Sequence, residues 1–178
     1  MSCVLGVDPG LSGALAFLRK DGRLLVRDVP TFEVKRGKRK KRELNQHGLQ
    51  EILSKFGSGV VVAYVEVASA RPGQGTTSMF AFGFVYGSLR QAVVSNCIAL
   101  EHVTPQVWRK VLKVRKGKDA SRLRASELMP EYAELWSRVK DHGRAEAALI
   151  AYYGAVQRGY IGSPSSSTRV GGRVRRGG

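Results

Sequence analysis

Acidic side chains occur at two points where apolar segments of the chain come to an end. Asp8 closes an apolar stretch and is followed at once by Pro9 and Gly10. A carboxylate before such a turn either caps the turn through hydrogen bonds or coordinates a ligand. Glu66 lies near the end of the apolar run 60–67, where an ionised group is costly unless it is paired or bound to a metal. We therefore favour a chemical role for Glu66, while both interpretations of Asp8 stay open.

A third group of ionisable side chains lies in the sequence DHGRAE, residues 141–146. If this segment begins a helix, His142 and Glu146 lie on the same face, because they are four residues apart. Asp141 and Glu146 are five residues apart and point well away from each other. His142 and Glu146 are therefore the better pair. Asp141 either caps the helix or is an alternative candidate for the same acidic role.

These acids converge if the first strand of the chain and its central strand are parallel neighbours. Asp8 and Glu66 then meet at one edge of the sheet, and a helix that contains Glu146 can pack beside them. Carboxylate oxygens are hard ligands that suit Mg²⁺ or Mn²⁺. Two such ions can hold the attacking water and the leaving oxygen during phosphodiester hydrolysis. The pattern thus predicts a metal-assisted phosphodiester hydrolase.

The elements that must position these acids follow from hydrophobic periodicity and turn signals. An apolar strand at 3–8 is followed by two more strands, joined at Asp21-Gly22, a dipeptide that favours hairpins. The charged stretch 33–42 is expected to be an exposed loop. The expected strands are 3–8, 14–18, 24–29, 60–67 and 97–102, and the expected helices are 44–56, 76–94, 105–112, 120–129 and an amphipathic helix at 142–157. Three antiparallel strands followed by alternating helices and strands predict an α/β domain with a mixed β-sheet flanked by α-helices.

The helix expected at 76–94 is long and apolar, yet it contains Gly83 and Gly87. Their spacing of four places both on one face, where another helix or a DNA backbone could come close. Tight packing of that face on the sheet is an equally good interpretation. The aromatic residues Phe80, Phe82 and Phe84 could stack on nucleic acid or lie in the core, and we expect at least two of the three to lie in the core.

The charge balance predicts a polyanionic partner. The chain has 30 Lys and Arg residues against 14 Asp and Glu, a net charge of +16 and a pI near 10.5. Three clusters hold most of the basic residues, at 35–42, at 109–124 and in the tail after Gly162. Each cluster alone could be a solvated loop or tail. Together they favour contact with phosphates, which supplies affinity without reading a base sequence.

The length of 178 residues suits one compact domain, which we place at 1–161, followed by a disordered basic tail at 162–178. No apolar run approaches the roughly 20 residues that cross a bilayer, and no secretory signal begins the chain. We expect a soluble intracellular protein that does not bind membranes. Both Cys3 and Cys97 lie in apolar stretches, so we expect buried free thiols.

Two motifs resemble those of a known family. Residues 4–14, VLGVDPGLSGA, resemble the first motif of RuvC-type Holliday junction resolvases, in which a strand ends in the first catalytic Asp. Residues 64–70, YVEVASA, with RPGQG at 71–75, resemble the second motif, in which a strand-end Glu precedes a loop and a long helix. The PGQG sequence and the helix start GRAEA are similar to the plastid branch and related phage members. The resemblance spans residues 4–159.

The resemblance implies a ribonuclease H-like fold and a homodimer that cuts two strands of a four-way DNA junction symmetrically with Mg²⁺, which Mn²⁺ can replace. When the roles of the family's motif residues are assigned to the matching positions, the resemblance implies that Asp8 and Glu66 are metal ligands and that Glu146 is the last catalytic acid. His142 takes a position that Asp often holds. A neutral imidazole there can bind a metal or transfer a proton, and Asp141 stays in reserve for this role. No small-molecule cofactor is implied.

The resemblance also indicates DNA contacts. Lys116 and Lys118 resemble the phosphate-facing lysines of the family, with a solvated loop as the alternative. The loop 71–79, with Arg71 and Gln74, is expected to reach the junction centre. The cluster at 35–42 is larger than the family usually carries and could extend the contact to a DNA arm through its central residues, which are Lys38, Arg39 and Lys40.

Three other functions stay open at the level of sequence. The turn GVDPGLSG at 6–13 could be the phosphate loop of an actin-like ATPase, but such enzymes need two related domains and this chain has one. A catalytically silent protein could bind branched nucleic acid through charge alone. A nuclease of the same fold could act on flaps or RNA hybrids, because a fold does not fix its substrate. We expect a cytoplasmic protein of a bacterium or phage-infected cell, or one of a DNA-containing organelle.

Overall fold

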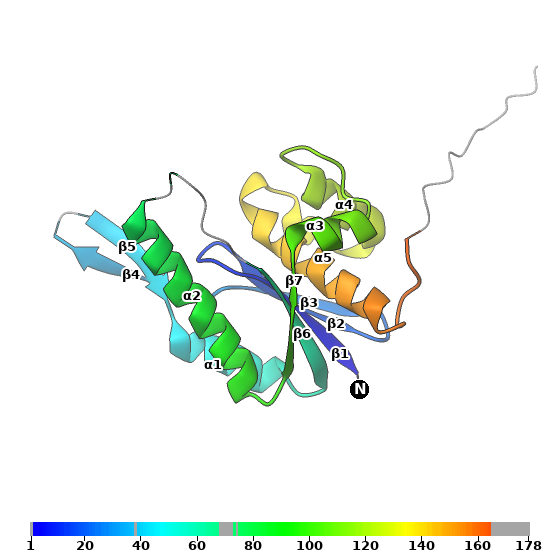
Figure 1. Ribbon diagram of the computed structural model, residues 1–178, viewed down its shortest axis with the longest axis horizontal. Coiled ribbons are helices and arrows are strands. Elements are labelled where there is room, and N and C mark those ends of the chain that lie inside the picture. Colours follow the sequence, from blue (N-terminus) through cyan, green and yellow to red (C-terminus); the bar gives the residue numbers. More distant parts are fainter. Residues whose placement is uncertain (1, 38, 68–72, 74, 165–178) are drawn as a thin grey trace, which may run out of the picture.

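A five-stranded mixed sheet forms the centre of the domain (Figure 1). The computed structural model describes residues 2–37, 39–67, 73 and 75–164. The strands lie in the order β3-β2-β1-β6-β7, with β1, β2 and β3 antiparallel and with β6 and β7 parallel to β1. Their bounds are Cys3–Asp8 (β1), Ala14–Arg19 (β2), Leu24–Asp28 (β3), Val60–Glu66 (β6) and Ala99–Val103 (β7). The predicted mixed sheet is therefore confirmed.

Helices cover both faces of this sheet and create two hydrophobic cores (Figure 1). On one face lie α1 and α2, which bury Leu49, Leu53 and Leu89 against the sheet. On the other face lies α5, with α3 and α4 packed beside it. The helix bounds are Gln46–Phe56 (α1), Thr76–Ser95 (α2), Pro105–Val111 (α3), Ala120–Leu128 (α4) and His142–Gln157 (α5), with short 3₁₀ turns at Pro130–Trp136 (η1) and Val139–Asp141 (η2).

The central strand β1 packs directly on α5. A Cβ atom at Gly6 would lie only 2.3 Å from the carbonyl oxygen of Ala147 and 2.3 Å from the backbone nitrogen of Ala151. Glycine at this position is what lets strand and helix approach so closely. Burial of α5 extends around most of its surface, from Gly143 to Ala155. The prediction of an amphipathic helix is therefore wrong here, because α5 is enclosed by the sheet on one side and by α3, α4 and η1 on the others.

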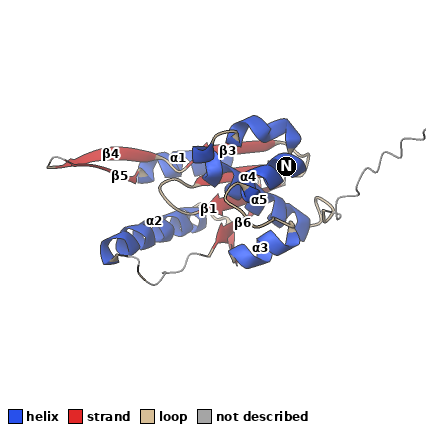
Figure 2. Ribbon diagram, turned by 90° about the horizontal axis from the view of Figure 1, so that it is seen from above, coloured by secondary structure: helices blue, strands red, loops and turns tan. Residues whose placement is uncertain are grey.

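The charged segment that was expected to be a loop is a β-hairpin. Strands β4 (Thr31–Arg36) and β5 (Arg39–Leu44) pair antiparallel in a sheet of their own, and Figure 2 shows them extending away from the rest of the domain. High charge excludes a segment from the core, but it does not prevent strand pairing when both faces of the ribbon contact solvent. Among the hairpin side chains that the structure describes, only that of Leu44, at the base, is buried.

Two local features explain the remaining differences from the prediction. The helix α1 begins at Gln46 and not at residue 44, because Leu44 still belongs to β5 and the side chain of Asn45 caps the helix by accepting a hydrogen bond from the Gly48 N–H. Cys97 lies in an exposed turn with a positive φ of 56° before β7. The expectation of a buried Cys97 in a strand is therefore wrong.

The other cysteine behaves as expected. Cys3 is buried and unpaired, and burial raises the pKa of its thiol to about 11. Within the described residues, no helix combines the length and the apolarity needed to span a bilayer. The predicted disordered tail lies almost wholly outside the described residues, since only 162–164 of it are described.

Candidate active site

The topology brings two of the predicted acids to one edge of the sheet. Strands β1 and β6 are parallel neighbours, with Val7 paired to Val65, and the next residue of each strand is an acid, Asp8 or Glu66. Because the carboxyl ends of parallel neighbours lie at the same edge, both acids lie there. The first turn of α5 closes on them, since a Cβ atom at Gly143 would be 2.9 Å from Oδ2 of Asp8. The expected convergence of strand ends is confirmed.

The carboxylate of Asp8 lies near two other acids, Glu66 and Glu146, and experiences the negative charge of both. Burial raises its pKa well above the usual value, and the charges of Glu146 and Glu66 raise it further. An aspartate that served only to cap a turn would be stabilised in its ionised form by hydrogen bonds. Asp8 instead stands where three carboxylates repel one another, and this is an environment that a cation stabilises.

Glu66 is anchored by a residue that the sequence did not single out. The indole Nε1 of Trp108, a fully buried residue of α3, donates a hydrogen bond of 2.7 Å to Oε2 of Glu66. Burial raises the pKa of Glu66, while this hydrogen bond opposes the rise. Trp108 thereby fixes the direction of this partly buried carboxylate.

Glu146 receives three donors on a single oxygen. The guanidinium of Arg109 lies 2.5 Å from Oε1, the hydroxyl of Ser121 lies 3.0 Å from it, and Nε2 of His142 lies 3.2 Å from it. Burial alone would raise the pKa of Glu146, but the hydrogen bonds and positive charges of these neighbours outweigh it and lower the pKa. Glu146 in turn raises the pKa of His142. The predicted His142–Glu146 pair is thus confirmed.

Asp141 has different surroundings from the other acids. It is 5% exposed, and the guanidinium of Arg138 binds both of its oxygens, at 2.8 and 2.9 Å. These hydrogen bonds lower its pKa. Its side chain makes no capping bond to α5, so the capping interpretation is wrong. Asp141 instead closes the short turn η2 by pairing with Arg138.

The three carboxylates suit a divalent cation chemically, but their present positions do not form a complete metal-binding site. Among the described residues, no three His, Cys, Asp or Glu side chains lie close enough together to hold a metal ion as they stand. The carboxylates of Asp8, Glu66 and Glu146 are nevertheless near enough to interact electrostatically. Hard oxygen donors with unbalanced negative charge fit Mg²⁺. Arg109 supplies the compensating charge on one side of this group.

The residues expected to bind DNA lie in several places. Lys116 and Lys118 are exposed in the loop before α4. The pKa of the neighbouring Asp119 is lowered mainly by a hydrogen bond from Arg122, and the charges of Lys118 and His142 lower it further. Lys40 is exposed on β5 and pairs with Glu33 at 3.0 Å. The other expected contacts fall outside what is described: residues Arg71, Gln74 and Lys38 entirely, and Arg39 in its side chain.

The aromatic residues of α2 do not follow the expectation that most lie in the core. Phe80 and Phe84 are 79% and 54% exposed, while Phe82 is partly buried and stacks on Tyr86. The expectation failed because α2 is apolar on nearly all sides, so its sequence does not reveal which face meets the sheet. Gly83 and Gly87 also face open space, so they do not pack tightly on the sheet.

Three residues of the site escaped the sequence analysis, namely Trp108, Arg109 and Ser121. None belongs to an acidic motif, and each acts through a tertiary contact with Glu66 or Glu146. A signal for Trp108 did exist. The helix that contains it follows β7, which is the parallel neighbour of β6, so the start of that helix must lie near the end of the strand that carries Glu66.

The mixed α/β fold matches the ribonuclease H-like fold seen in solved RuvC structures. A Thermus thermophilus RuvC in complex with a Holliday junction substrate matches with a TM-score of 0.60 and 16% identity, over 89% of this chain and 96% of that one. The yeast mitochondrial Holliday junction resolvase Ydc2 matches with a TM-score of 0.55 and 15% identity, over 89% and 80%. No protein-family model matches the sequence, and no curated protein is significantly similar to it. At sequence identities of 16% and 15%, structural similarity to these proteins establishes the fold alone.

Proposed function

We propose that this protein is a metal-dependent endonuclease that resolves four-way DNA junctions by paired symmetrical nicks. The observation that carries the proposal is the cluster of mutually repelling acids, Asp8, Glu66 and Glu146, at one edge of the sheet. Two solved proteins of the same fold are, by name, a RuvC bound to a Holliday junction and a Holliday junction resolvase. The strong positive charge of the chain suits a DNA substrate. The motif likeness to the plastid and phage branch remains part of this proposal.

In this mechanism Asp8, Glu66 and Glu146 would hold two Mg²⁺ ions, with His142 as a further ligand. When bound, such ions would supply water activation and charge stabilisation for phosphodiester hydrolysis. Trp108 and Arg109 keep the glutamates oriented by hydrogen bonds. His142 exposes 42% of its side chain beside Glu146, so it can also transfer a proton to or from the site. Asp141 takes no part, because Arg138 occupies both of its oxygens.

DNA contact extends the site over the basic segments. Lys116 and Lys118 contact backbone phosphates beside the acids, and the hairpin, with Lys38, Arg39 and Lys40, contacts an arm of the junction. The loop with Arg71 and Gln74, which follows Glu66 in the sequence, is proposed to reach the junction centre. The protein would act wherever recombining DNA is present, in a bacterial or phage-infected cell or in a DNA-containing organelle.

A homodimer would place two such sites on the two strands of a junction. The exposed side of α2 suits this assembly, because it combines Gly83 and Gly87, which have open space above them, with Val94, which is 52% exposed. We call the residues Gly83, Gly87, Gln91 and Val94 the glycine stripe. Two copies of α2 could approach closely along this stripe, since neither glycine has a side chain to hold the backbones apart.

Replacing Glu66 by Gln tests the proposal. The wild type and E66Q are each given a four-way junction, a linear duplex, a flap and an RNA–DNA hybrid, with Mg²⁺ and with a chelator. We expect the wild type to nick only the junction, at symmetrical positions, and E66Q to bind it without cleavage. Equal cutting of linear duplex by the wild type, or unchanged cleavage by E66Q, would contradict the proposal. The matched control is Glu134→Gln, at an acid on η1 away from the three carboxylates.

Two observations favour a second function, that of a protein that binds branched DNA without cutting it. Arg109 already neutralises Glu146, and the described residues contain no ready-made metal cluster. The same experiment separates the two functions. A non-catalytic protein binds the junction and leaves it intact with every metal ion, and E66Q then behaves like the wild type.

A further inference from the structure

A cavity of about 410 Å³ lies at the edge of the sheet opposite the acidic site. It is formed by the starts of β1 and β3 and by the ends of β2 and α1. Cys3, which lines it, and Asp8 are the first and last residues of β1, so they lie about 17 Å apart at about 3.3 Å per residue. Pockets that bind ligands usually measure about 300–1,000 Å³, and this cavity is within that range.

Much of the surface inside this cavity is apolar. Cys3 and Phe17 are buried, whereas Leu25 and Phe56 keep part of their surface exposed. The rings of Phe17 and Phe56 pack with their centres 6.0 Å apart. Burial raises the pKa of the Cys3 thiol to about 11, so this thiol is uncharged at neutral pH. The cavity therefore offers an apolar surface to a ligand.

The charged side chains that line this cavity in the described part of the chain are all basic. They are Arg19, Arg23 and Lys55. Asp21, in the turn between β2 and β3, lies 3.1 Å from Arg19 and 3.4 Å from Arg23, so it balances one of the three charges. Arg23 still exposes 74% of its side chain. The rim therefore keeps a positive charge, which attracts an anionic ligand.

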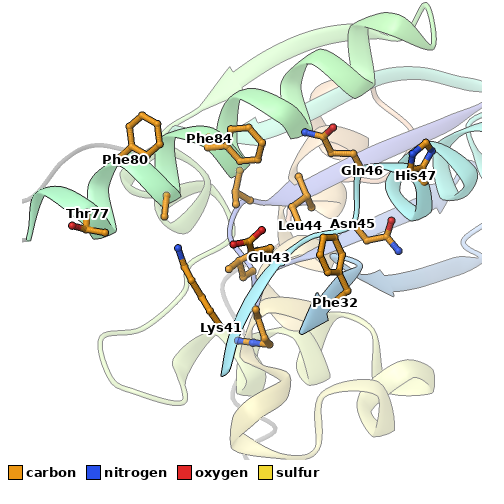
Figure 3. Close-up of a pocket in the computed structure, with 14 residues that line it drawn as sticks. Phe32, Lys41, Glu43, Leu44, Asn45, Gln46, His47, Thr77, Phe80 and Phe84 are labelled. Carbon is orange, nitrogen blue, oxygen red and sulfur yellow. The ribbon is translucent and has the colours of Figure 1, made fainter. Parts of the chain in front are cut away.

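The larger cavity between the β4–β5 hairpin and α2 has a different character. Figure 3 shows side chains of both signs, Lys41 and Glu43, among those that line it. Such a lining does not favour an anion over a cation. The cavity at the start of β1 differs because its apolar surface is bordered by charges of one sign.

The cations near Phe56 argue against a nucleic acid as the occupant. The guanidinium of Arg27 lies 5.1 Å from the centre of this ring, and Nζ of Lys55 lies 5.5 Å from it. Cations at such distances are attracted to the face of the ring, so the face is not free for a base. A nucleic acid would then offer only phosphates and sugars, which leave the apolar surface uncovered.

The chain itself has the wrong charge to occupy this cavity. Its net charge is +16, and its tail contains four Arg residues after Gly162. Either the tail or a second copy would bring more positive charge to a basic rim, and like charges repel. The suitable occupant is anionic and partly apolar. A peptide that combines Asp or Glu with an apolar side chain has both properties, and clusters of basic residues commonly recognise acidic motifs.

We propose that this cavity binds an acidic peptide segment of a partner protein. An apolar side chain of the peptide enters the cavity, and carboxylates beside it pair with Arg23 and Lys55. The proposal does not rest on the nuclease, because none of these residues belongs to the acidic site. Since the cavity lies at the opposite edge of the sheet, the partner could stay bound while DNA occupies the acidic site.

NMR of the isotope-labelled full chain tests the proposal. The probe is a mixture of eight-residue peptides with Asp or Glu at six positions and Leu, Ile, Phe or Trp at two. A second mixture has Ser at those two positions. We expect the first mixture to shift the amide signals of Leu25, Phe56 and Ser58, and the second to shift them much less. No shift at these residues, or equal shifts with both mixtures, would overturn the proposal.

Two variants give the second readout, and circular dichroism verifies that each is folded. Arg23→Glu replaces an attraction by a repulsion at an exposed residue, so we expect the affinity for the first mixture to fall about tenfold. Ser58→Trp places an indole where Ser58 lines the cavity, so it should abolish binding without changing the charge of the rim. Peptide affinities equal to that of the wild type in both variants would contradict the proposal.

The matched control is Lys110→Glu, which makes the same change of charge at an exposed residue of α3. Charges more than about 8 Å apart are largely screened at about 0.15 M salt, so under these conditions the peptide affinity should change by less than about twofold. An equal loss in Lys110→Glu and Arg23→Glu would mean that the peptides respond only to net charge, and the proposed site would be wrong.

The affinity for DNA separates the peptide site from a nucleic-acid site. We expect Arg23→Glu to bind a linear duplex within about twofold of the wild type at the same salt concentration. A tenfold loss of duplex affinity with unchanged peptide affinity would place the cavity in the DNA interface and overturn the proposal. If the wild type binds the peptides as expected but never cuts a junction, the peptide site stands and only the proposed nuclease is wrong.

Discussion

Replacing Gly6 by Ala should destabilise the protein strongly, because β1 and α5 touch through this residue. The new Cβ atom would lie 2.3 Å from both Ala147 O and Ala151 N, whereas an ordinary contact begins near 3.4 Å. The strand and the helix must therefore separate by about 1 Å. The opposing atoms belong to the helix backbone and cannot rotate away, so the change cannot be absorbed by one flexible side chain.

The free energy follows from this geometry. Over-packing a core typically costs about 1–3 kcal/mol, and a clash with backbone on two sides falls at the upper end. In a protein of 150–250 residues, 1 kcal/mol shifts the Tm by about 2–4 °C. We therefore expect Gly6→Ala to lower the Tm by about 6–12 °C. Because α5 carries Glu146 and β1 carries Asp8, a 1 Å separation would also slow junction cleavage by about a hundredfold.

Thermal denaturation followed by circular dichroism measures the first effect, and the nicking rate at a temperature where the variant stays folded measures the second. Gly162→Ala is the matched control, because a Cβ atom there meets nothing within 4 Å, and its Tm should equal that of the wild type. If Gly6→Ala has the same Tm as the wild type, the close strand–helix contact does not exist and the placement of both acids is wrong.

Three other changes have clear expected outcomes. Burial and the neighbouring acids raise the pKa of Asp8 in the folded state. The free energy of unfolding therefore falls as the pH rises from about 3.9, the pKa of Asp in the unfolded chain, through the folded pKa. Asp8→Asn should consequently unfold at a higher urea concentration than the metal-free wild type at pH 7, but not at pH 3. Trp108→Phe removes a hydrogen bond that opposes the raised pKa of Glu66, so the acidic limb of the rate–pH profile should move to higher pH, and an unchanged limb would contradict this role. Replacing Lys40 and Lys41 by Ala should reduce the slope of log affinity against log salt by about 0.9 per lost phosphate contact, while an unchanged slope would remove the hairpin from the DNA interface.

The strand ends and the helical pair could be predicted because they depend on local sequence. An apolar run that stops at Asp8 or Glu66 identifies a strand and its end at once, and the fold then determines which edge both acids share. The pairing of His142 with Glu146 needs only the periodicity of a helix. These predictions used spacing within one element or the adjacency of two strands, and neither depends on how side chains pack.

The parts that could not be predicted depend on tertiary contacts or on competing interpretations of charge. The hairpin was missed because its basic residues exclude burial but are compatible with either a loop or an exposed ribbon. The exposed face of α2, with Phe80 and Phe84, could not be identified because apolar residues occur on all sides of this helix. Arg138 lies three residues before Asp141, yet only the folded turn η2 shows that it occupies both oxygens of that acid.

The hydrogen bonds at the acidic site suggest how it can exist without metal and still accept one. In the described part of the chain, the three donors to Glu146 all meet Oε1, and Trp108 meets only Oε2 of Glu66. Each glutamate therefore has one oxygen fixed by the protein and one left for a ligand. Partners that fix one side of a metal-binding side chain orient the other side toward the ion. Arg109 balances part of the charge before an ion arrives, so the acids can lie close together without unfolding the edge of the sheet. The proposed cation, held by Asp8 and the two glutamates, would offset the repulsion that Arg109 leaves.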